Sequence, residues 1–292
     1  MKKLFHHKVS FFDSHLIKTV GSILTIIVGL FSGILAFFDL KSQTKLLLFL
    51  ILVILILSLY LFLFFKANAI KKLNLFVDDS EITIQEGNIF SKKIFDNPQI
   101  IKVFAFNEYF DTQVDDAIIS RSSLNGQFIK KKVTVDNIKE LNNRIENDNR
   151  LKKYIVSKNS TRKQGKKIKY ELGSIFKYSD DIFLTALTHF NDKNQAFLSI
   201  QDYVKFLIDF WDQIDELYAN RTVVITLFGS GITRLEHKMF NNTQILQILL
   251  WTFSLRRIKF KKPAKFIILL DEATNKNIDY YKVKVGFRDL QK

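Results

Sequence analysis

Cysteine is absent from this sequence of 292 residues, and proline occurs only at Pro98 and Pro263. A chain without cysteine has no disulfide framework, which suits a reducing compartment. The sequence also lacks an HExxH motif and any cluster of cysteine and histidine with the spacing of zinc ligands. We therefore predict neither a disulfide-stabilised domain nor a structural or catalytic zinc site.

Acidic residues are too few to balance the basic ones, since 44 Lys and Arg residues stand against 29 Asp and Glu, a net charge of +15. Such an excess is compatible with a nucleic acid, an anionic membrane surface or a phosphate-bearing ligand. It belongs to the chain after residue 65, because residues 66–292 hold 38 basic and 27 acidic residues. No aromatic residues are interleaved with the run Lys130-Lys131-Lys132, so we interpret that run as solvated surface.

Two long apolar runs occupy the N-terminal part of the chain. Residues 16–40 are interrupted only by Lys18 and Asp39, and residues 46–65 carry no charge. Each run is long enough to cross the ~30 Å hydrocarbon layer as a helix, and residues 41–45 between them are too few for a domain. We predict a transmembrane hairpin rather than a cleaved signal peptide, with a buried helical hairpin in a soluble core as the alternative.

Lysine residues flank the predicted hairpin unequally, which favours both chain ends in the cytoplasm. Those on the side of the termini are Lys2, Lys3, Lys8, Lys18, Lys66, Lys71 and Lys72, against Lys41 and Lys45 at the tip. Residues 1–15 are then a cytoplasmic N-terminus, and residues 66–80 are predicted as a linker.

The two predicted spans differ in kind. Thr25, Gly29 and Gly33 recur every four residues in the first span, a spacing that lets helix backbones approach closely in lipid. The second span consists almost entirely of Leu, Ile and Phe, so we expect it to face lipid. The three small residues are therefore predicted to pack against neighbouring helices.

From residue 81 to residue 292 the pattern is that of an α/β domain, because predicted strands alternate with predicted helices. Strands are predicted at residues 81–85, 100–106, 168–176, 182–190, 223–228 and 265–270. Helices are predicted near residues 138–145 with Asp136 as N-cap, from Ser199 onward, and at residues 242–256. Residues 122–127 are predicted as a polar loop and residues 157–169 as a basic, solvated hairpin or loop.

Residues 222–234 form the stretch around which this domain is organised. The apolar, β-branched run at residues 223–228 predicts a strand buried on both faces, and Gly229-Ser230-Gly231 follows at once. Thr233-x-x-Glu236 has the form of a capping box that would open a helix. Glycine at such a position either lets backbone N–H groups approach an anion or only supplies a positive φ angle. A nucleotide-hydrolysing P-loop is not supported, because no lysine follows the glycines.

Taken in chain order, these features resemble the macro domain, an α/β/α sandwich around a mixed sheet that binds ADP-ribose. The matching segments are Gly87-Asn88-Ile89, a strand that ends at Asn107, a first phosphate loop at residues 122–128 and a second at residues 228–234. Many macro domains place an aspartate, which accepts a hydrogen bond from the adenine amino group, where this chain has Asn88. The amide oxygen of Asn88 can accept the same hydrogen bond but carries no charge.

Three strings make the resemblance more specific. NEYFDT at residues 107–112, SSLNGQF at 122–128 and GSGITR at 229–234, set behind two apolar spans, are similar to the ThsA family of Thoeris anti-phage defence effectors with transmembrane and macro domains. The resemblance implies a protein of the bacterial inner membrane. It implies that the macro domain binds an ADP-ribose-derived messenger made from NAD by a TIR-domain partner, after which the protein oligomerises and damages the lipid bilayer.

The resemblance also implies a set of ligand-binding residues and no catalytic residue, cofactor or metal. The set is Gly87, Asn88, Ile89, Asn107, Asp111, Ser123, Leu124, Asn125, Gly126, Gln127, Phe228, Gly229, Ser230, Gly231, Ile232, Thr233 and Arg234. For Asp111, a ligand contact and a capped turn are equally compatible with the sequence.

Two other functions remain open from the sequence. Some macro domains hydrolyse ADP-ribose adducts with an asparagine, so Asn107 keeps a membrane-anchored hydrolase as the alternative. The positive charge keeps a membrane-tethered nucleic-acid-binding protein open as well, for which affinity would fall steeply with salt. We prefer the effector, without a nucleic-acid partner, because a hydrolase does not need a membrane hairpin.

Overall fold

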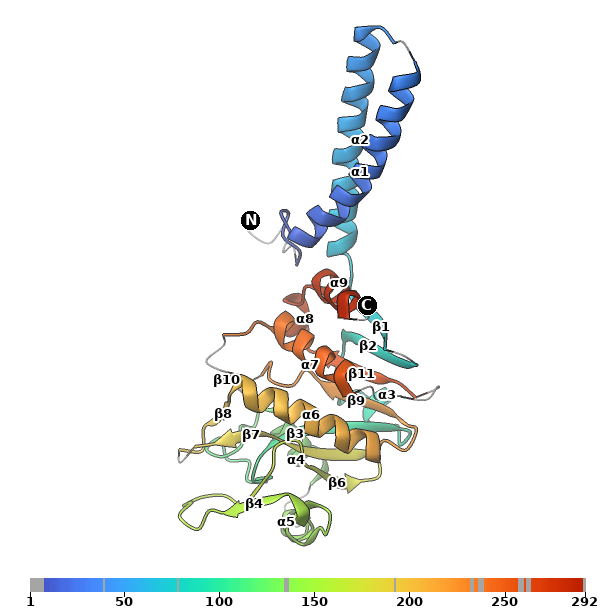
Figure 1. Cartoon of the computed structure of the whole chain (residues 1–292). Coiled ribbons are helices and arrows are strands. Elements are labelled where there is room, and N and C mark those ends of the chain that lie inside the picture. The colour runs from blue at the N-terminus through green and yellow to red at the C-terminus, as the bar shows by residue number, and fades with distance from the viewer. Residues whose placement is uncertain are drawn as a thin grey trace. The chain divides into compact units, whose positions relative to one another are not determined.

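The computed structural model describes residues 8–38, 40–77, 79–133, 137–191, 193–231, 234–235, 239–256, 260 and 264–290. The chain divides into two compact units, shown together in Figure 1. The first, which we call the hairpin unit, contains Met1–Lys71 and Asp279–Gly286. The second, the sheet unit, contains Lys72–Ile278 and Phe287–Lys292. Each unit is described by itself.

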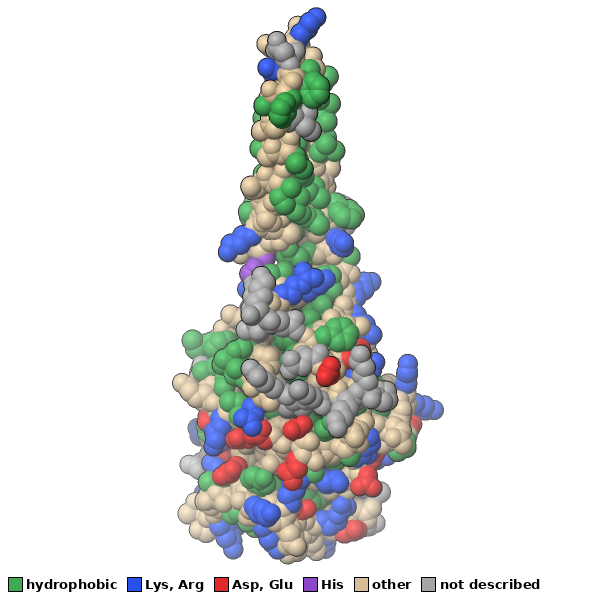
Figure 2. Space-filling model, turned by 45° about the vertical axis from the view of Figure 1, so that its right-hand side comes forward, with side chains coloured by type: hydrophobic (Ala, Val, Ile, Leu, Met, Phe, Trp, Pro, Cys, Tyr) green, Lys and Arg blue, Asp and Glu red, His purple; other side chains and the backbone are tan. Residues whose placement is uncertain are grey.

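The hairpin unit is built on two long antiparallel helices, α1 (Ser14–Phe37) and α2 (Ser42–Asn68). Asp13 caps α1, because its Oδ1 accepts the backbone N–H groups of His15 and Leu16, each at 3.0 Å. Most of their apolar side chains are exposed, and Figure 2 shows hydrophobic side chains along the hairpin with basic ones at its ends. By length and composition, both helices can cross a membrane.

The C-terminal helix α9 (Tyr280–Leu290) contributes its first two turns to the hairpin unit. The hydroxyl groups of Thr19 and Tyr281 are 3.0 Å apart, and the amine of Lys8 lies 4.8 Å from the centroid of the Tyr280 ring. The sequence analysis predicted no helix at residues 280–290. The hairpin unit is therefore made from both ends of the chain.

The sheet unit is organised around a nine-stranded mixed sheet in the order β1-β2-β11-β9-β3-β7-β8-β10, with β6 also paired to β7. Five neighbouring strands, β2, β11, β9, β3 and β7, are parallel, whereas β1 pairs antiparallel with β2, and β6 and β8 pair antiparallel with β7. The bounds of the sheet's strands are β1 (Lys72–Val77), β2 (Ser80–Glu86), β3 (Ile100–Asn107), β6 (Ile175–Ser179), β7 (Ile182–Phe190), β8 (Ala196–Leu198), β9 (Thr222–Thr226), β10 (Arg234–Leu235) and β11 (Phe266–Leu270). A separate antiparallel pair, β4 (Ile155–Lys158) and β5 (Ile168–Tyr170), forms the arms of a hairpin.

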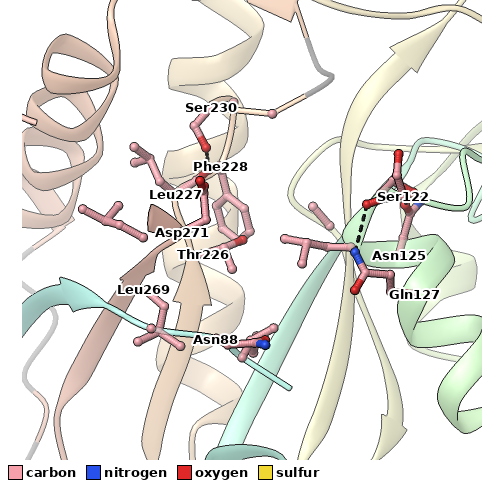
Figure 3. Close-up of a pocket in the computed structure, with 18 of the residues that line it drawn as sticks. Asn88, Ser122, Asn125, Gln127, Thr226, Leu227, Phe228, Ser230, Leu269 and Asp271 are labelled. Atoms are coloured by element: carbon pink, nitrogen blue, oxygen red, sulfur yellow. Dashed lines mark hydrogen bonds between the residues drawn. The ribbon is translucent and has the colours of Figure 1, made fainter. Parts of the chain in front are cut away.

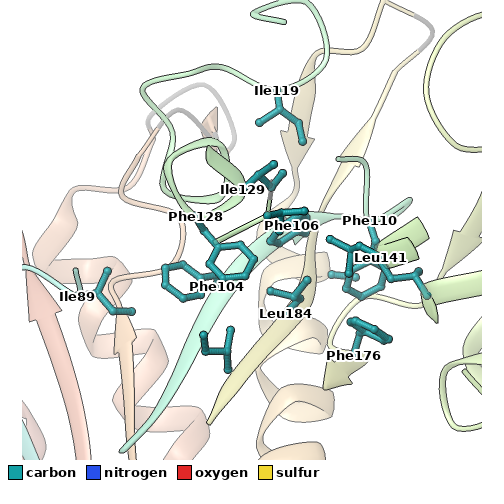
Figure 4. Packing of buried hydrophobic residues seen from close by; sticks show 14 of the residues in the cluster. Ile89, Phe104, Phe106, Phe110, Ile119, Phe128, Ile129, Leu141, Phe176 and Leu184 are labelled. Atoms are coloured by element: carbon teal, nitrogen blue, oxygen red, sulfur yellow. The ribbon is translucent and has the colours of Figure 1, made fainter. Parts of the chain in front are cut away.

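Helices cover both faces of the sheet, which confirms the predicted α/β/α sandwich. The helices of this unit are α3 (Lys92–Phe95), α4 (Leu124–Lys132), α5 (Asn137–Asn147), the 3-10 helix η1 (Leu151–Tyr154), α6 (Ile200–Leu217), α7 (Asn242–Arg256) and α8 (Glu272–Lys276). On one face, Phe104 of β3 stacks on Phe128 of α4 with ring centroids 4.7 Å apart, within the hydrophobic cluster shown in Figure 4. On the other face, Trp211 of α6 packs edge-on against Phe266 of β11 at 5.0 Å. Side chains that alternate along the strands thus fill two separate cores.

The domain boundary differs from the prediction. α2 continues to Asn68 and β1 already begins at Lys72, so only residues 69–71 connect these two elements. β1 pairs with β2 along its whole length. Residues 66–80 are therefore not a linker, and the sheet unit begins at Lys72 rather than at residue 81.

Three predicted segments have a different local structure. Residues 122–127 contain the start of α4, because the hydroxyl of Ser123 caps that helix. Residues 168–176 are two short strands, separated at Gly173, whose φ angle of +89° lies in the left-handed region. Residues 157–169 do form a hairpin, but its Arg162 is buried and not solvated.

The chain after the glycine loop also differs from the prediction. Arg234–Leu235 form β10, which pairs parallel with β8, so this segment enters a strand and not a helix. Thr233 and Glu236 of the predicted capping box, and the N-cap predicted at Asp136, lie outside the described residues. The helix predicted from Asn242 is confirmed as α7.

Candidate functional site

A cavity of about 640 Å³ lies across the carboxyl ends of the five parallel strands. In an open α/β sheet this edge is where ligands bind. Figure 3 shows the side chains at the start of α4 on one side of the cavity, facing the end of β9 and the residues after it. The lining consists of Glu86, Gly87, Asn88, Ile89, Ala105, Ser122, Ser123, Leu124, Asn125, Gln127, Leu187, Thr226, Leu227, Phe228, Gly229, Ser230, Gly231, Leu269, Leu270, Asp271 and Glu272. No described lysine or arginine lines it.

The turn after β2 brings Gly87, Asn88 and Ile89 to the cavity, as predicted. A β-carbon at Gly87 would stand 2.8 Å from a methyl group of Leu269, so glycine allows the close approach of β2 and β11 here. The amide oxygen of Asn88, which we expected to face adenine, already accepts the backbone N–H of Phe90 at 2.9 Å. Asn88 therefore folds back on its own turn, and its amide oxygen keeps one lone pair for a ligand.

The start of α4 forms the opposite wall. Ser123 accepts the N–H of Gly126 at 3.2 Å, and the side-chain amide of Gln127 donates to the Ser122 carbonyl at 2.9 Å. Gly126 itself does not line the cavity, because it packs against the backbone, and a β-carbon there would stand 2.2 Å from the Ser120 carbonyl oxygen. Gly126 shapes the turn here, and its contact with a ligand stays a prediction. The first N–H groups of a helix have no partner within the helix and favour an anion.

The glycine loop after β9 is held in place by Tyr203 of α6. Tyr203 donates from its hydroxyl to the carbonyl oxygen of Phe228 at 2.9 Å, and both residues are buried. Gly229 has a φ angle of +83°, which favours glycine, whereas a β-carbon added at Gly231 would meet no atom of the described residues within 4 Å. Phe228–Gly231 line the cavity as predicted; Ile232, Thr233 and the side chain of Arg234 lie outside what the structure describes.

Acidic residues that the sequence analysis did not predict line one end of the cavity. Asp271 follows β11 and caps α8. Its carboxylate accepts hydrogen bonds from the backbone N–H of Thr274 at 3.0 Å and from the hydroxyl of Thr274 at 2.6 Å. Burial raises the pKa of Asp271, but these hydrogen bonds outweigh it and hold the pKa below its ordinary value. Glu86 at the end of β2 accepts from Asn275 at 2.6 Å. The only local signal was the position of Glu86 and Asp271 at the ends of strands.

Asn107 and Asp111 lie outside the main cavity. Asn107 lines a smaller hollow of about 110 Å³, which shares Ala105, Ser123, Asn125 and Leu187 with the main cavity. Asp111 lines neither space; its carboxylate is 1% exposed and forms an ion pair with Arg162 at 2.7 Å. Of the two roles left open for Asp111, the structure therefore supports the structural one.

Several known proteins are similar to this chain. The family model for the macro domain of the Thoeris protein ThsA matches residues 82–271. A Thoeris protein ThsA from Bacillus amyloliquefaciens (strain Y2) is 40% identical over 254 residues, which cover 87% of this chain and 83% of the relative.

Two solved macrodomain mutants from Oceanobacillus iheyensis, the second with ADPR, give TM-scores of 0.47 and 0.45 at 11% identity. They cover 75% of this chain and 100% and 97% of their own. Because the family model matches more than half of the chain and a relative shares 40% of its residues, this chain belongs to the Thoeris ThsA family and carries its macro domain.

Proposed function

We propose that this protein is a membrane-anchored anti-phage effector whose macro domain binds an ADP-ribose-derived messenger. The observation that carries the proposal is the order of chemical groups along the cavity. Asp271 and Glu272 line the end at β2 and β11, the glycine loop and the start of α4 line the middle, and Asn107 lies at the end of β3, in the hollow toward β7.

This order suits the three parts of an ADP-ribose unit. Carboxylates accept hydrogen bonds from the amino group of adenine and from ribose hydroxyls. Backbone N–H groups of the glycine loop and of the start of α4 suit a diphosphate, which explains how an anion binds without a described lysine or arginine in the lining. The small hollow beside Asn107 would then receive the second sugar or a group attached to it.

The rest of the proposal concerns the membrane. A TIR-domain partner would supply the messenger from NAD, and both termini and the macro domain would lie in the cytoplasm, beneath the bacterial inner membrane. A ligand changes a protein only through different affinities for two states. We therefore propose that the bound form associates with further copies and that α1 and α2 of the assembled chains disrupt the bilayer.

The direct test is calorimetry on the full-length protein in detergent micelles. Titrants are ADP-ribose, its amino-acid conjugates, ADP and AMP, with ribose 5-phosphate as the control that lacks adenosine. We expect micromolar or tighter binding for a ligand that contains the ADP-ribose unit, and weaker binding for AMP. Binding of none of them would contradict the proposal.

The same samples test the hydrolase alternative. After incubation with each conjugate, chromatography separates intact ligand from released ADP-ribose. Recovery of intact ligand supports a receptor, whereas steady release of ADP-ribose would identify an enzyme.

A further inference from the structure

Arg162 makes the most extensive buried polar contacts of the basic hairpin at residues 157–169. Its guanidinium donates to both carboxylate oxygens of Asp111, at 3.1 and 2.7 Å, and to the carbonyl oxygen of Lys166 at 2.6 Å. It also donates to the side chain of Asn194 at 2.8 Å and lies over the ring of Tyr109 at 4.0 Å. A planar group with a fixed fork of donors matches such a set of acceptors, and a lysine does not.

Asp111 connects Arg162 to the end of β3. The carboxylate oxygen that accepts from Arg162 Nη2 also accepts from Asn107 Nδ2, at 3.0 Å. The amide oxygen of Asn107 is held in turn by the backbone N–H groups of Tyr109 and Asp111, at 3.0 and 3.3 Å. Asn107 is therefore held in one orientation by two backbone N–H groups on its oxygen and by the ion-paired carboxylate of Asp111 on its nitrogen.

That orientation bears on the ligand cavity. Asn107 lines the small hollow next to the main cavity, and one of the two hydrogens on its Nδ2 is used by Asp111. Within the described part of the chain no residue accepts the second hydrogen, so it is available to a ligand. The hollow lies at the β3 and β7 end of the site, beyond the middle that suits a diphosphate.

We propose that Arg162 is a positioning residue that, through Asp111, sets Asn107 to recognise a hydroxyl group beyond the diphosphate of the ligand. This inference rests on the proposed function and adds a specificity to it. The basic hairpin then makes the site select a diphosphate that carries a second sugar over a plain nucleoside diphosphate. Without the guanidinium, Asp111 would be a buried carboxylate without its charge partner, and it would no longer fix Asn107.

The test compares ADP-ribose with ADP on the full-length protein in detergent micelles, because only ADP-ribose has the second sugar. Arg162→Lys keeps the charge but loses the fork. We expect the affinity for ADP-ribose to fall at least ~10-fold and the affinity for ADP to fall less than ~2-fold. The ratio of the two affinities therefore falls. Lys163→Gln is the control, since it removes an exposed charge from the same hairpin and should leave both affinities unchanged.

A double-mutant cycle that combines Arg162→Lys with Asn107→Ala tests whether Arg162 acts through Asn107. If it does, Arg162→Lys added to Asn107→Ala lowers the affinity ratio no further, because the two changes remove the same interaction. Additive losses, an unchanged ratio, or equal losses for both ligands would overturn the proposal.

A milder variant covers the case in which Arg162→Lys does not fold. Asn194→Gly removes one acceptor of the guanidinium and keeps a residue that tolerates the positive φ angle of 55° at this turn. We expect an intermediate fall in the affinity ratio, and an unchanged ratio would count against the proposal. Failure of the unchanged protein to bind either ligand would instead overturn the proposed function itself.

Discussion

The hydroxyl of Tyr203, near the start of α6, donates a hydrogen bond to the carbonyl oxygen of Phe228, at the start of the glycine loop. The two atoms are 2.9 Å apart and fully enclosed, and burial raises the pKa of Tyr203 so that the hydroxyl keeps its proton. The ring of Tyr203 also lies beneath Gly229, 3.6 Å from the position of a β-carbon there. One side chain thus holds the loop both by its hydroxyl and by its ring.

Tyr203→Phe should therefore destabilise the fold and loosen the glycine loop. The change leaves the buried carbonyl of Phe228 without its partner, which costs about 1–3 kcal/mol. Thermal unfolding measures the stability, and calorimetry with ADP-ribose measures the effect on the site. Equal stability of the variant and the unchanged protein would show that the hydrogen bond contributes nothing net.

Gly231→Val tests the glycine loop without straining the fold. The α-carbon of Gly231 has open space around it and an ordinary φ angle, so a side chain should be accepted by the protein but not by a bound phosphate. We expect an unchanged melting temperature and a loss of ADP-ribose affinity of at least ~10-fold, or about 1.4 kcal/mol.

The matched control for this change is Gly229→Val. Its φ angle of +83° makes any side chain strained, so this variant should lose stability as well as affinity. Full affinity in a folded Gly231→Val protein would remove the loop from the phosphate site.

Asp271→Asn tests whether the acidic end of the cavity binds the adenosine part of the ligand. Asparagine caps a helix as well as aspartate does, so α8 should persist while the charge is lost. We expect affinity for ADP-ribose to fall about 5-fold, because a hydrogen bond to a charged acceptor is stronger than one to a neutral acceptor.

The loss should be the same at pH 6 and pH 8. The pKa of Asp271 lies below its ordinary value, so the carboxylate is ionised throughout this range. Any binding of ribose 5-phosphate, which has no adenosine, should not change in the variant. An unchanged affinity for ADP-ribose would assign Asp271 to the helix cap alone.

Lys166 makes the stability of the fold depend on pH in the alkaline range. Burial lowers its pKa to about 8, against the opposing charges of Asp111 and Glu146, and its amine has no hydrogen-bond partner among the described residues. Above pH 8 the folded state loses this proton while the unfolded chain keeps it up to its ordinary value near 10.5. Stability contributed by this group therefore rises with pH between these values.

Lys166→Met should remove that rise and stabilise the protein at pH 7. The measurement is the melting temperature of the variant minus that of the unchanged protein, taken from pH 7 to pH 10. We expect a positive difference that shrinks as the pH increases. The exposed Lys163→Met serves as the control and should show no such trend.

Strands and helices with a strong pattern of their own could be predicted from the sequence. β3, β7 and β9 were found because each is a short, mostly apolar run, and α6 and α7 because their apolar residues recur at helical spacing. The position of the glycine loop at a strand end followed from the same patterns. None of these predictions needed knowledge of which segments meet in space.

Other parts depend on contacts between distant segments. Asp271 belongs to the site only because β11, late in the chain, lies between β2 and β9. Arg162 looked solvated since it lies in a basic segment, and its partner Asp111 is 51 residues away. The small hollow likewise needs the pairing of β3 with β7.

The small residues of α1 provide a test of the membrane proposal. Thr25, Gly29 and Gly33 are exposed along α1, and a β-carbon added at either glycine would meet no described atom within 4 Å outside its own helical turn. Replacing both glycines by leucine keeps the helix long and apolar, so insertion and ligand binding should persist. Close packing between helices of neighbouring chains should not.

The assay is dye entry into cells that also produce the TIR-domain partner and are infected with phage. We expect loss of dye entry in the double variant and normal dye entry in the control Ile26→Leu with Val28→Leu. Full dye entry in the glycine variant would show that this stripe is not the interface, and disruption by clustered α2 helices would then be favoured.

The hairpin unit contains the N-terminal segment Met1–Lys71 and the late segment Asp279–Gly286, so the chain leaves this unit and returns to it. This arrangement limits how the protein can be recombined. A chimera that exchanges only Met1–Lys71 would separate Thr19 from the hydroxyl of Tyr281 that pairs with it. A module that natural recombination or an engineer could transplant intact has three junctions, after Lys71, before Asp279 and after Gly286.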